Sequence, residues 1–171
     1  MTGAFVFETP RLYARRLDAN DVDALHAVYG DVETVRWVAD GTPLDLAQCA
    51  QWVDVTLDNY GKRGYGMWAL IERATGDVVG FCGLVHPGGQ PDAEIKYAFR
   101  RDRWGRGFAT EAAGALLAHA AGTLGIRHVI ATVAPENAAS QRVLLKAGMQ
   151  RGPLRRNDDG SFTQLFSTGP G

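Results

Sequence analysis

The chain has 171 residues and a formal net charge of −1 at pH 7, from 18 Lys and Arg against 19 Asp and Glu. This length fits one domain over residues 1–171 with a sizeable core, and the balanced charge excludes a protein whose whole surface is basic for nucleic acid. The two cysteines and four histidines lack the spacing of a disulfide framework or a metal site. We therefore expect no metal and no nucleic-acid partner.

The sequence shows no targeting or membrane-spanning pattern. Residues 1–8 contain no basic segment followed by a long apolar run, and no apolar run approaches the roughly 20 residues that span a bilayer. We expect a cytoplasmic protein without a membrane partner, either a monomer or a homodimer.

The first third of the chain predicts a strand followed by two helices. Residues 11–17 have strand character after Pro10, and residues 18–21 supply the start of a helix over residues 22–29. Beyond a break at residues 41–43, apolar side chains recur at steps of four and three, which is typical of one helix face. The expected core face of this second helix consists of Leu46, Ala50, Val53, Leu57 and Tyr60.

Three strands are expected in the middle of the chain. Residues 65–72 and 78–85 are rich in apolar side chains and flank a turn, which predicts a hairpin with buried faces. Residues 93–99 form the next strand after a loop rich in glycine and proline. Residues 107–120 then show the spacing of a long helix with a face of small and aliphatic side chains.

The last third predicts a strand, a helix and a closing hairpin. Residues 129–133 are strand-like, Asn137 is placed as a helix N-cap, and Gly148 is placed just beyond the end of that helix. Residues 149–155 and 162–167 flank a turn and read as the two strands of the hairpin.

The order of elements predicts the fold class. Hairpins beside a single strand-helix-strand crossover indicate an α+β protein with three layers, in which a mixed, mostly antiparallel sheet of about seven strands is flanked by about four helices. A doubly wound parallel sheet does not fit this order.

A glycine-rich turn, Gly105-Arg106-Gly107, opens the long helix and predicts an anion site. Backbone N–H groups can approach a phosphate closely at such a turn, and the helix dipole favours negative charge there. The dinucleotide fingerprint fails because position 110 is Thr and no acidic residue follows about 20 positions later. A Walker A loop fails because no Gly-Lys-Ser/Thr follows. The turn therefore predicts a pyrophosphate site of another kind.

Residues 104–109, Trp-Gly-Arg-Gly-Phe-Ala, resemble the acyl-CoA loop of the GNAT superfamily of N-acyltransferases. The resemblance is strongest to the branch that contains the ribosomal-protein N-terminal (alanine/serine) acetyltransferases, and it extends over most of the chain. Residues 8–12 together with Arg15 and Asp21 resemble the N-terminal signature of that branch, and residues 94–97 resemble its Glu-Ile-Gly-Tyr strand.

The resemblance continues in Asn137, Ser140 and residues 146–149, which resemble a later helix of that branch. Two positions depart from the pattern. Trp104 replaces the Arg or Gln of the general motif, as is usual in this branch, and Lys96 replaces a Gly on the acceptor side of the strand. Lys96 is therefore expected to crowd or to charge the acceptor site.

The resemblance implies that acetyl-CoA is the co-substrate. Backbone N–H groups of the turn would hold its pyrophosphate, the strand would run beside its pantetheine, Asn137 would bind the pantetheine arm, and an arginine would face a phosphate. The implied cofactor-binding residues are Tyr97, Phe99, Arg101, Gly105, Arg106, Gly107, Phe108, Ala109, Thr110 and Asn137.

The chemistry of acyl transfer suggests two catalytic residues. The reaction needs a neutral amine, a polarised carbonyl and a protonated leaving thiolate, and an α-amine with a pKa of about 8 needs only a weak base. Glu94 is the candidate base and Ser140 the candidate proton donor. Each also has a purely structural interpretation, because Glu94 can pair with Lys96 or an arginine and Ser140 can satisfy a local backbone group.

We therefore expect an N-acetyltransferase that transfers an acetyl group from acetyl-CoA to a primary amine by direct attack in a ternary complex. The acceptor is either a peptide N-terminus or a small-molecule amine. Two other classes remain open at this point: a non-catalytic acyl-CoA-binding regulatory module of the same fold, and a nicotinamide- or nucleotide-binding enzyme.

Overall fold

The structure is a computed structural model that describes residues 3–169. Within this range the eight strands are β1 (Phe5–Glu8), β2 (Leu12–Arg16), β3 (Met67–Glu72), β4 (Val78–Val85), β5 (Ala93–Phe99), β6 (Val129–Val133), β7 (Gln150–Arg156) and β8 (Phe162–Ser167). The four α-helices are α1 (Val22–Tyr29), α2 (Leu46–Arg63), α3 (Phe108–Gly122) and α4 (Ala138–Lys146). Short 3₁₀ turns lie at Ala19–Asp21, Pro87–Gly89 and Arg101–Arg103.

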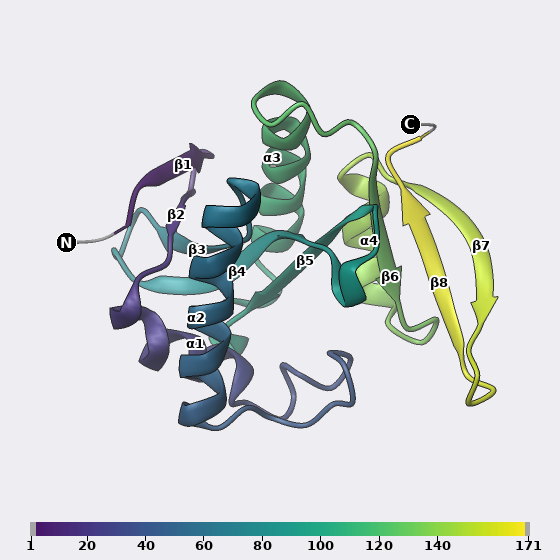
Figure 1. The fold of residues 1–171 in the computed structure, drawn as a ribbon, viewed down its shortest axis with the longest axis horizontal. Coiled ribbons are helices and arrows are strands. Elements are labelled where there is room, and N and C mark those ends of the chain that lie inside the picture. Colours follow the sequence, from purple (N-terminus) through teal and green to yellow (C-terminus); the bar gives the residue numbers. More distant parts are fainter. Residues whose placement is uncertain (1–2, 170–171) are drawn as a thin grey trace.

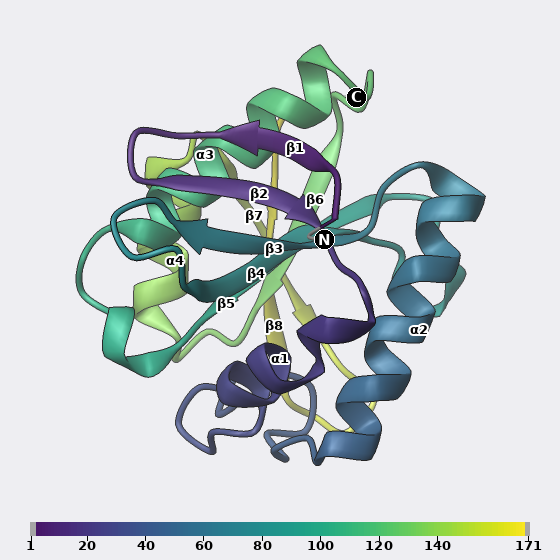
Figure 2. The same cartoon turned by 90° about the vertical axis from the view of Figure 1, so that its left-hand side faces the viewer.

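The strands form one mixed sheet in the order β1-β2-β3-β4-β5-β6-β8-β7, in which only β5 and β6 are parallel among the described pairs. Helices α1 and α2 lie on one face and α3 and α4 on the other, as Figure 1 and Figure 2 show. The core is correspondingly divided, with Val53 and Phe81 in the cluster beside α1 and α2, and Phe99 and Leu116 in the cluster beside α3 and α4. The predicted three-layer fold with a mostly antiparallel sheet is confirmed.

Strand β1 is the element that the sequence analysis missed. It is only four residues long, and it pairs with β2 through a register shift between Phe5 and Phe7. Phe5 is 62% exposed, so the short segment lacks the buried alternation by which a strand is recognised. The sheet therefore has eight strands where about seven were predicted.

Helix α2 is present as predicted, but only part of the predicted core face is buried. Leu46, Ala50 and Leu57 are exposed, whereas Val53 and Tyr60 are buried as expected. The observed buried face consists of Cys49, Val53, Thr56 and Tyr60. Both sets have steps of four and three and share Val53 and Tyr60, so periodicity alone does not separate them.

Arg15 and Asp21, which belong to the N-terminal signature, form a buried ion pair. The two guanidinium Nη atoms donate to the two carboxylate oxygens at 2.9 and 2.8 Å, and the backbone N–H of Asp18 donates to the same carboxylate at 2.8 Å. The pair joins β2 to the turn that starts α1. Its role in this structure is to fix the entry into α1, which leads to the loop over residues 30–45.

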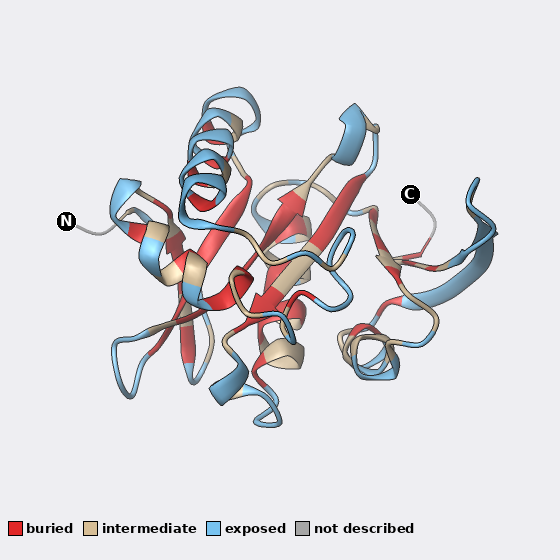
Figure 3. Cartoon of the chain, turned by 90° about the horizontal axis from the view of Figure 1, so that it is seen from below, coloured by how far each residue is buried: buried red, intermediate tan, exposed pale blue. Residues whose placement is uncertain are grey.

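The middle of the sheet opens between its two parallel strands. Strand β4 pairs with β5 from Glu94 to Phe99, but β6 pairs with β5 only at Ala93 and Glu94. Beyond this point β5 and β6 diverge, so one edge of β5 has no neighbouring strand from Ile95 onward. Figure 3 shows that the central strands are buried, whereas the edge strand β7 is exposed along its length.

Among residues 3–169, no helix is long and apolar enough to cross a membrane.

Candidate active site

A cleft of about 1430 Å³ lies where β5 and β6 diverge. Its walls come from the loop after α1, from α2, from β5 and the turn that follows it, from α4, and from the β7–β8 hairpin. The cleft is lined by nine of the predicted site residues: Tyr97, Phe99, Gly105, Gly107, Phe108, Ala109, Thr110, Asn137 and Ser140. Glu94, Arg101 and Arg106 do not line it.

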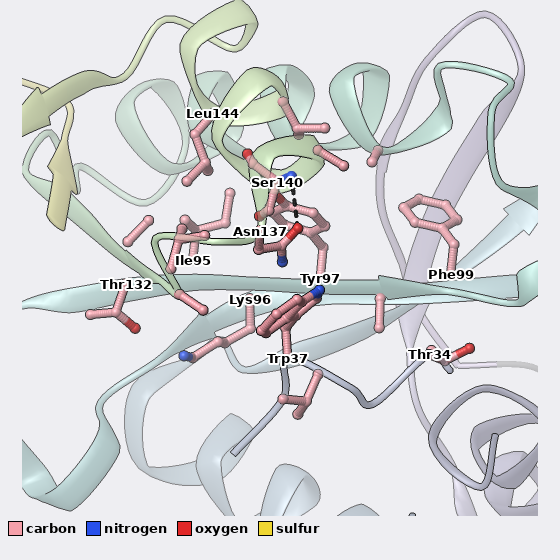
Figure 4. A pocket seen from close by; sticks show the side chains of 18 of the residues that line it. Thr34, Trp37, Ile95, Lys96, Tyr97, Phe99, Thr132, Asn137, Ser140 and Leu144 are labelled. Atoms are coloured by element: carbon pink, nitrogen blue, oxygen red, sulfur yellow. Dashed lines mark hydrogen bonds between the residues drawn. The ribbon is translucent and has the colours of Figure 1, made fainter. Parts of the chain in front are cut away.

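Strand β5 divides the cleft into two halves, because successive side chains of a strand point to opposite faces. Figure 4 shows Tyr97, Asn137 and Ser140 on the side of α4, which we call the α4 half. Lys96 and Trp37 lie on the opposite side, toward α1 and α2, which we call the α2 half. The two halves meet at the unpaired edge of β5.

The glycine-rich turn has the backbone geometry that an anion site requires. Gly105 and Gly107 have φ angles of 75° and 79°, a left-handed conformation that other residues adopt only with strain. Gly107 is the N-cap of α3, and the first helical hydrogen bond runs from the N–H of Glu111 to the carbonyl of Gly107 at 3.1 Å. The amides of residues 108–110 precede that bond and are therefore available to a ligand in the cleft.

The side chain of Trp104 lies between the glycine-rich turn and the end of β5. Its indole Nε1 donates to the carbonyl of Phe99 at 2.9 Å. This bond ties the turn to the end of β5 and explains what the tryptophan contributes where the general motif has Arg or Gln. Three arginines of the same region are engaged with carboxylates: Arg100 with Asp102, Arg101 with Asp31, and Arg103 with Glu72.

Of the two arginines predicted to bind phosphate, Arg101 turns toward α1. Its Nη2 lies 2.8 Å from Asp31 Oδ1, which places the guanidinium outside the cleft. Arg106 has no ion pair among the described residues and lies in the turn itself. Phosphate binding by either side chain stays a prediction.

Glu111 anchors the first turn of α3 to the β1–β2 connection. Its carboxylate accepts from Thr9 Oγ1 at 2.5 Å, from the N–H of Arg11 at 3.0 Å and from Arg11 Nε at 2.8 Å. Burial raises the pKa of Glu111, but the hydrogen bonds from Thr9 and Arg11 outweigh it and hold the pKa below its ordinary value. The charged carboxylate therefore fixes the position of the helix end at the turn.

Tyr97, Asn137 and Ser140 form a polar group in the α4 half. The hydroxyl oxygens of Tyr97 and Ser140 are 2.6 Å apart, and Asn137 Oδ1 accepts from the N–H of Ser140 at 3.2 Å. Burial raises the pKa of Tyr97 to about 12, and the hydrogen bond to Ser140 opposes that shift. Asn137 is thus the N-cap of α4, as the structural interpretation of the sequence predicted, and its amide nitrogen stays available to a ligand.

Glu94 is buried beside the cleft, with only 3% of its side chain exposed. It accepts hydrogen bonds from Thr132 Oγ1 at 2.9 Å and from Gln90 Nε2 at 3.3 Å, and it forms an ion pair with Lys96. The pairing with Lys96 was one of the structural interpretations of the sequence. Because Thr132 and Lys96 both line the cleft, they separate the Glu94 carboxylate from it.

The structure adds functional candidates that the sequence analysis did not identify. Thr132 belongs to residues 129–133, which the sequence predicted only as a strand, and Leu154 and Phe162 belong to a hairpin with no site motif. All three line the cleft because elements distant in the sequence pack together, and no local pattern in the sequence indicates this. Trp37, in the loop after α1, lines the α2 half.

Among residues 3–169, no group of three or more His, Cys, Asp and Glu side chains is arranged to hold a metal ion. The residues present instead fit acetyl-CoA. Left-handed glycines allow close approach of a pyrophosphate to the backbone, the adjacent amides can donate to it, and the unpaired edge of β5 offers a place for an extended arm.

Comparison with known proteins agrees with this geometry. The family profile described as Acetyltransferase (GNAT) domain matches residues 11–150. An uncharacterized N-acetyltransferase p20 of Bacillus licheniformis is 29% identical over 156 residues, which cover 87% of this chain and 84% of that protein.

Solved structures share the fold. An acetyltransferase of Agrobacterium tumefaciens str. C58 superposes with a TM-score of 0.82 at 25% identity, over 99% of this chain and 96% of the other. The RimL ribosomal L7/L12 alpha-N-protein acetyltransferase in complex with coenzyme A superposes with a TM-score of 0.80 at 18% identity, over 95% and 96% of the two chains. Taken with the family match, the cleft and its glycine-rich turn lead to one conclusion: this chain belongs to the GNAT family and is an acetyl-CoA-dependent acetyltransferase.

Proposed function

We propose that this protein is an N-acetyltransferase that transfers the acetyl group of acetyl-CoA to a primary amine by direct attack in a ternary complex. The acceptor is a peptide N-terminus or a small-molecule amine. The observation that carries the proposal is a continuous cleft that joins the amides of the glycine-rich turn to the α2 half across the unpaired edge of β5. Such a cleft can hold both substrates at once, as direct transfer requires.

Acetyl-CoA supplies the acetyl group as a thioester, and residues of this chain would hold it in the α4 half. The amides of residues 105–110 donate to its pyrophosphate. The backbone of Tyr97 and Phe99 lies along its pantetheine, and Asn137 donates to that arm. In this arrangement the reacting carbon lies at the edge of β5, where the two halves of the cleft meet.

Proton removal from the acceptor amine falls to Glu94 in this proposal. The carboxylate does not reach the cleft directly, but Thr132 Oγ1 donates to it at 2.9 Å and lines the cleft. The Thr132 oxygen can accept a proton from the amine while its own proton moves to Glu94. In this proposal the Thr132 hydroxyl is the relay between the amine and the base.

Proton delivery to the departing sulfur falls to Ser140. The bond from the amine nitrogen to the carbonyl carbon forms, the carbon–sulfur bond breaks, and the Ser140 hydroxyl gives its proton to the thiolate. Tyr97, whose pKa is raised by burial, is protonated at neutral pH, and its hydroxyl oxygen lies 2.6 Å from that of Ser140. A proton from solvent restores the Ser140 hydroxyl after the transfer.

The cysteines support direct attack over a covalent intermediate. Cys49 and Cys82 are buried, and neither lines the cleft. Burial raises the pKa of the Cys82 thiol, which disfavours the thiolate form that a nucleophile requires.

An acetyl-CoA consumption screen tests the proposal. The acceptors are peptides with varied N-termini and a panel of small primary amines, and the product is identified by a mass increase of one acetyl group on nitrogen. We expect amine-dependent release of CoA. Binding of acetyl-CoA without turnover on any amine would instead favour a non-catalytic acyl-CoA-binding regulatory module.

A further inference from the structure

Lys96 has no role in the proposed binding of acetyl-CoA. Its neighbours Ile95 and Tyr97 both line the cleft from β5, and Figure 4 shows Lys96 on the opposite side of the strand from Tyr97, in the α2 half. The side chain is 42% exposed. The strand thus places an ammonium group one residue from Tyr97, beside the point where the acetyl group is transferred.

The ion pair with Glu94 leaves this ammonium with donor capacity. Glu94 is almost fully buried and also accepts from Thr132 and Gln90, so several donors share its two oxygens. An ammonium has three N–H donors, and one contact to Glu94 leaves others for a ligand. Lys96 is therefore held in place by Glu94 while it remains accessible from the cleft.

The other charged groups that line the α2 half lie on its rim. Glu33 and Arg36 belong to the loop after α1, and both are exposed. The Arg36 guanidinium stacks on the Trp37 ring at 5.1 Å. Among the described residues that line this half, Lys96 is the charged group on the strand itself, and its ammonium is the group that an anion in the inner part would meet, with the buried Glu94 carboxylate behind it.

Large apolar side chains surround the mouth of the cleft. Trp37 is 43% exposed, Val55 55%, Leu154 53% and Phe162 46%, and they come from the loop after α1, from α2 and from the β7–β8 hairpin. Exposed apolar side chains that gather at one cleft are characteristic of a ligand surface. They suit an acceptor that carries an apolar side chain.

From these observations we infer that the acceptor bears a carboxylate close to its amino group together with an apolar side chain, and that Lys96 binds the carboxylate. This inference rests on the proposed function. The carboxylate belongs either to a free amino acid or to the acidic first residue of a peptide.

The test measures kcat/KM for leucine, leucinamide and 3-methylbutylamine, which share one side chain and differ in the carboxylate. Because Lys96 also pairs with Glu94, the proposed base, Lys96→Met is expected to change all three values. We expect kcat/KM for leucine to fall by about 10- to 100-fold more than the two other values, which is the range of a charge-assisted hydrogen bond. Each acceptor is compared between the original chain and the variant, so differences in amine pKa among the three acceptors do not affect the result.

Two dipeptide amides, Asp-Leu and Asn-Leu, form the second arm. A selective loss with Asp-Leu in the Lys96→Met variant identifies an acidic peptide N-terminus as the source, and a selective loss with leucine identifies a free amino acid. Lys96→Arg keeps the charge and is expected to retain the preference. Lys62→Met is the matched control, because Lys62 is an exposed lysine that pairs with Asp58 on α2, outside the cleft.

A measurement on the unaltered protein covers the case in which Lys96→Met does not fold. With CoA present, 4-methylpentanoate is expected to compete with the acceptor, whereas 4-methylpentanamide is not. Equal effects of the two compounds, or equal losses for leucine and leucinamide in the folded variant, overturn the inference and leave the proposed function standing. Absence of turnover with every amine would overturn both the inference and the proposed function.

Discussion

The hydroxyl oxygens of Tyr97 and Ser140 lie 2.6 Å apart, and this contact joins β5 to α4 across the opening of the sheet. Burial raises the pKa of Tyr97 to about 12, so the phenol stays protonated throughout the neutral range. The pair therefore places two neutral hydroxyl groups, rather than a charged acid, at the α4 side of the cleft. A proton donor of this kind stays in its active form over the whole neutral range.

We expect Ser140→Ala to lower kcat by about 100-fold or more, because the departing thiolate loses its proton donor, while the Kd for acetyl-CoA stays within about 3-fold. Steady-state kinetics and calorimetric titration with acetyl-CoA measure the two quantities. Tyr97→Phe removes the partner but keeps the Ser140 proton, so its kcat should fall less. A Ser140→Ala variant with unchanged kcat would show that a bound water or another group delivers the proton.

We expect Glu94→Gln to lower kcat by about 100-fold or more, and Thr132→Val to lower it by a comparable factor, because both remove the proposed proton path. Thr75→Val is the matched control, since Thr75 Oγ1 donates to the carboxylate of Glu72 at 3.1 Å, away from the cleft. Full activity of Thr132→Val together with loss of activity in Glu94→Gln would exclude the threonine as a relay.

We expect Gly107→Ala to raise the Kd for acetyl-CoA by about 10-fold or more, because a Cβ at a φ of 79° strains the turn and displaces its amides. The new Cβ itself would lie 3.5 Å from Arg11 Nη2, an ordinary contact, so strain and not a clash is the cause.

Gly160→Ala provides the control for this substitution, because Gly160 has a φ of 87° in the β7–β8 turn and nothing within 4 Å of the added Cβ. Both variants should lose about 1 to 2 kcal/mol of unfolding free energy. Only Gly107→Ala should bind acetyl-CoA more weakly. Equal Kd values for acetyl-CoA in the two variants would mean that the turn does not bind the pyrophosphate.

We expect Glu111→Gln to lower the free energy of unfolding by about 1 to 2 kcal/mol at pH 7, because the charge-assisted bonds from Thr9 and Arg11 are weakened. The pKa of Glu111 is lower in the folded chain than in the unfolded one, so the unfolded chain binds more protons as the pH falls. The stabilisation is thus complete above a pH of about 4.5, the ordinary value, and is lost below it as the pH falls through the folded pKa.

Urea unfolding at several pH values measures the difference between the original chain and Glu111→Gln. The two stabilities should converge as the pH falls from 5 toward 3, the acid range in which carboxylates titrate at about 4. A difference that stays constant across this range would mean that the neutral glutamine loses packing and not charge. Asp23→Asn, at an exposed position of α1, serves as the control substitution.

Local sequence rules account for most of the elements. The spacing of small and aliphatic side chains predicted α3, and the buried side chains of this helix include Ala112, Ala113, Leu116 and Ala120. The same kind of pattern predicted the core face of α2 only in part, because two overlapping sets of residues on this helix have the same spacing. Only the packing against the sheet selects between them.

The candidate site, too, could be predicted from the sequence only in part. The glycines of the turn and the cap at Asn137 were identified from the sequence, because left-handed backbone and helix ends impose local requirements on residue type. The hydrogen bond from Thr132 to Glu94 joins residues 38 positions apart, and neither residue type reveals it. That contact exists because β5 and β6 pair at Glu94 before they diverge.

By itself the sequence determined the order of helices and strands from β2 onward, the glycine-rich turn and its resemblance to the acyl-CoA loop, because these depend on neighbours within a few residues. The tertiary structure alone decided that Glu94 is buried behind Thr132 and Lys96, that Arg101 turns away from the cleft, and that apolar side chains gather at the mouth. Such facts depend on which faces of distant elements meet, and that is settled only when the whole chain packs around the opening between β5 and β6.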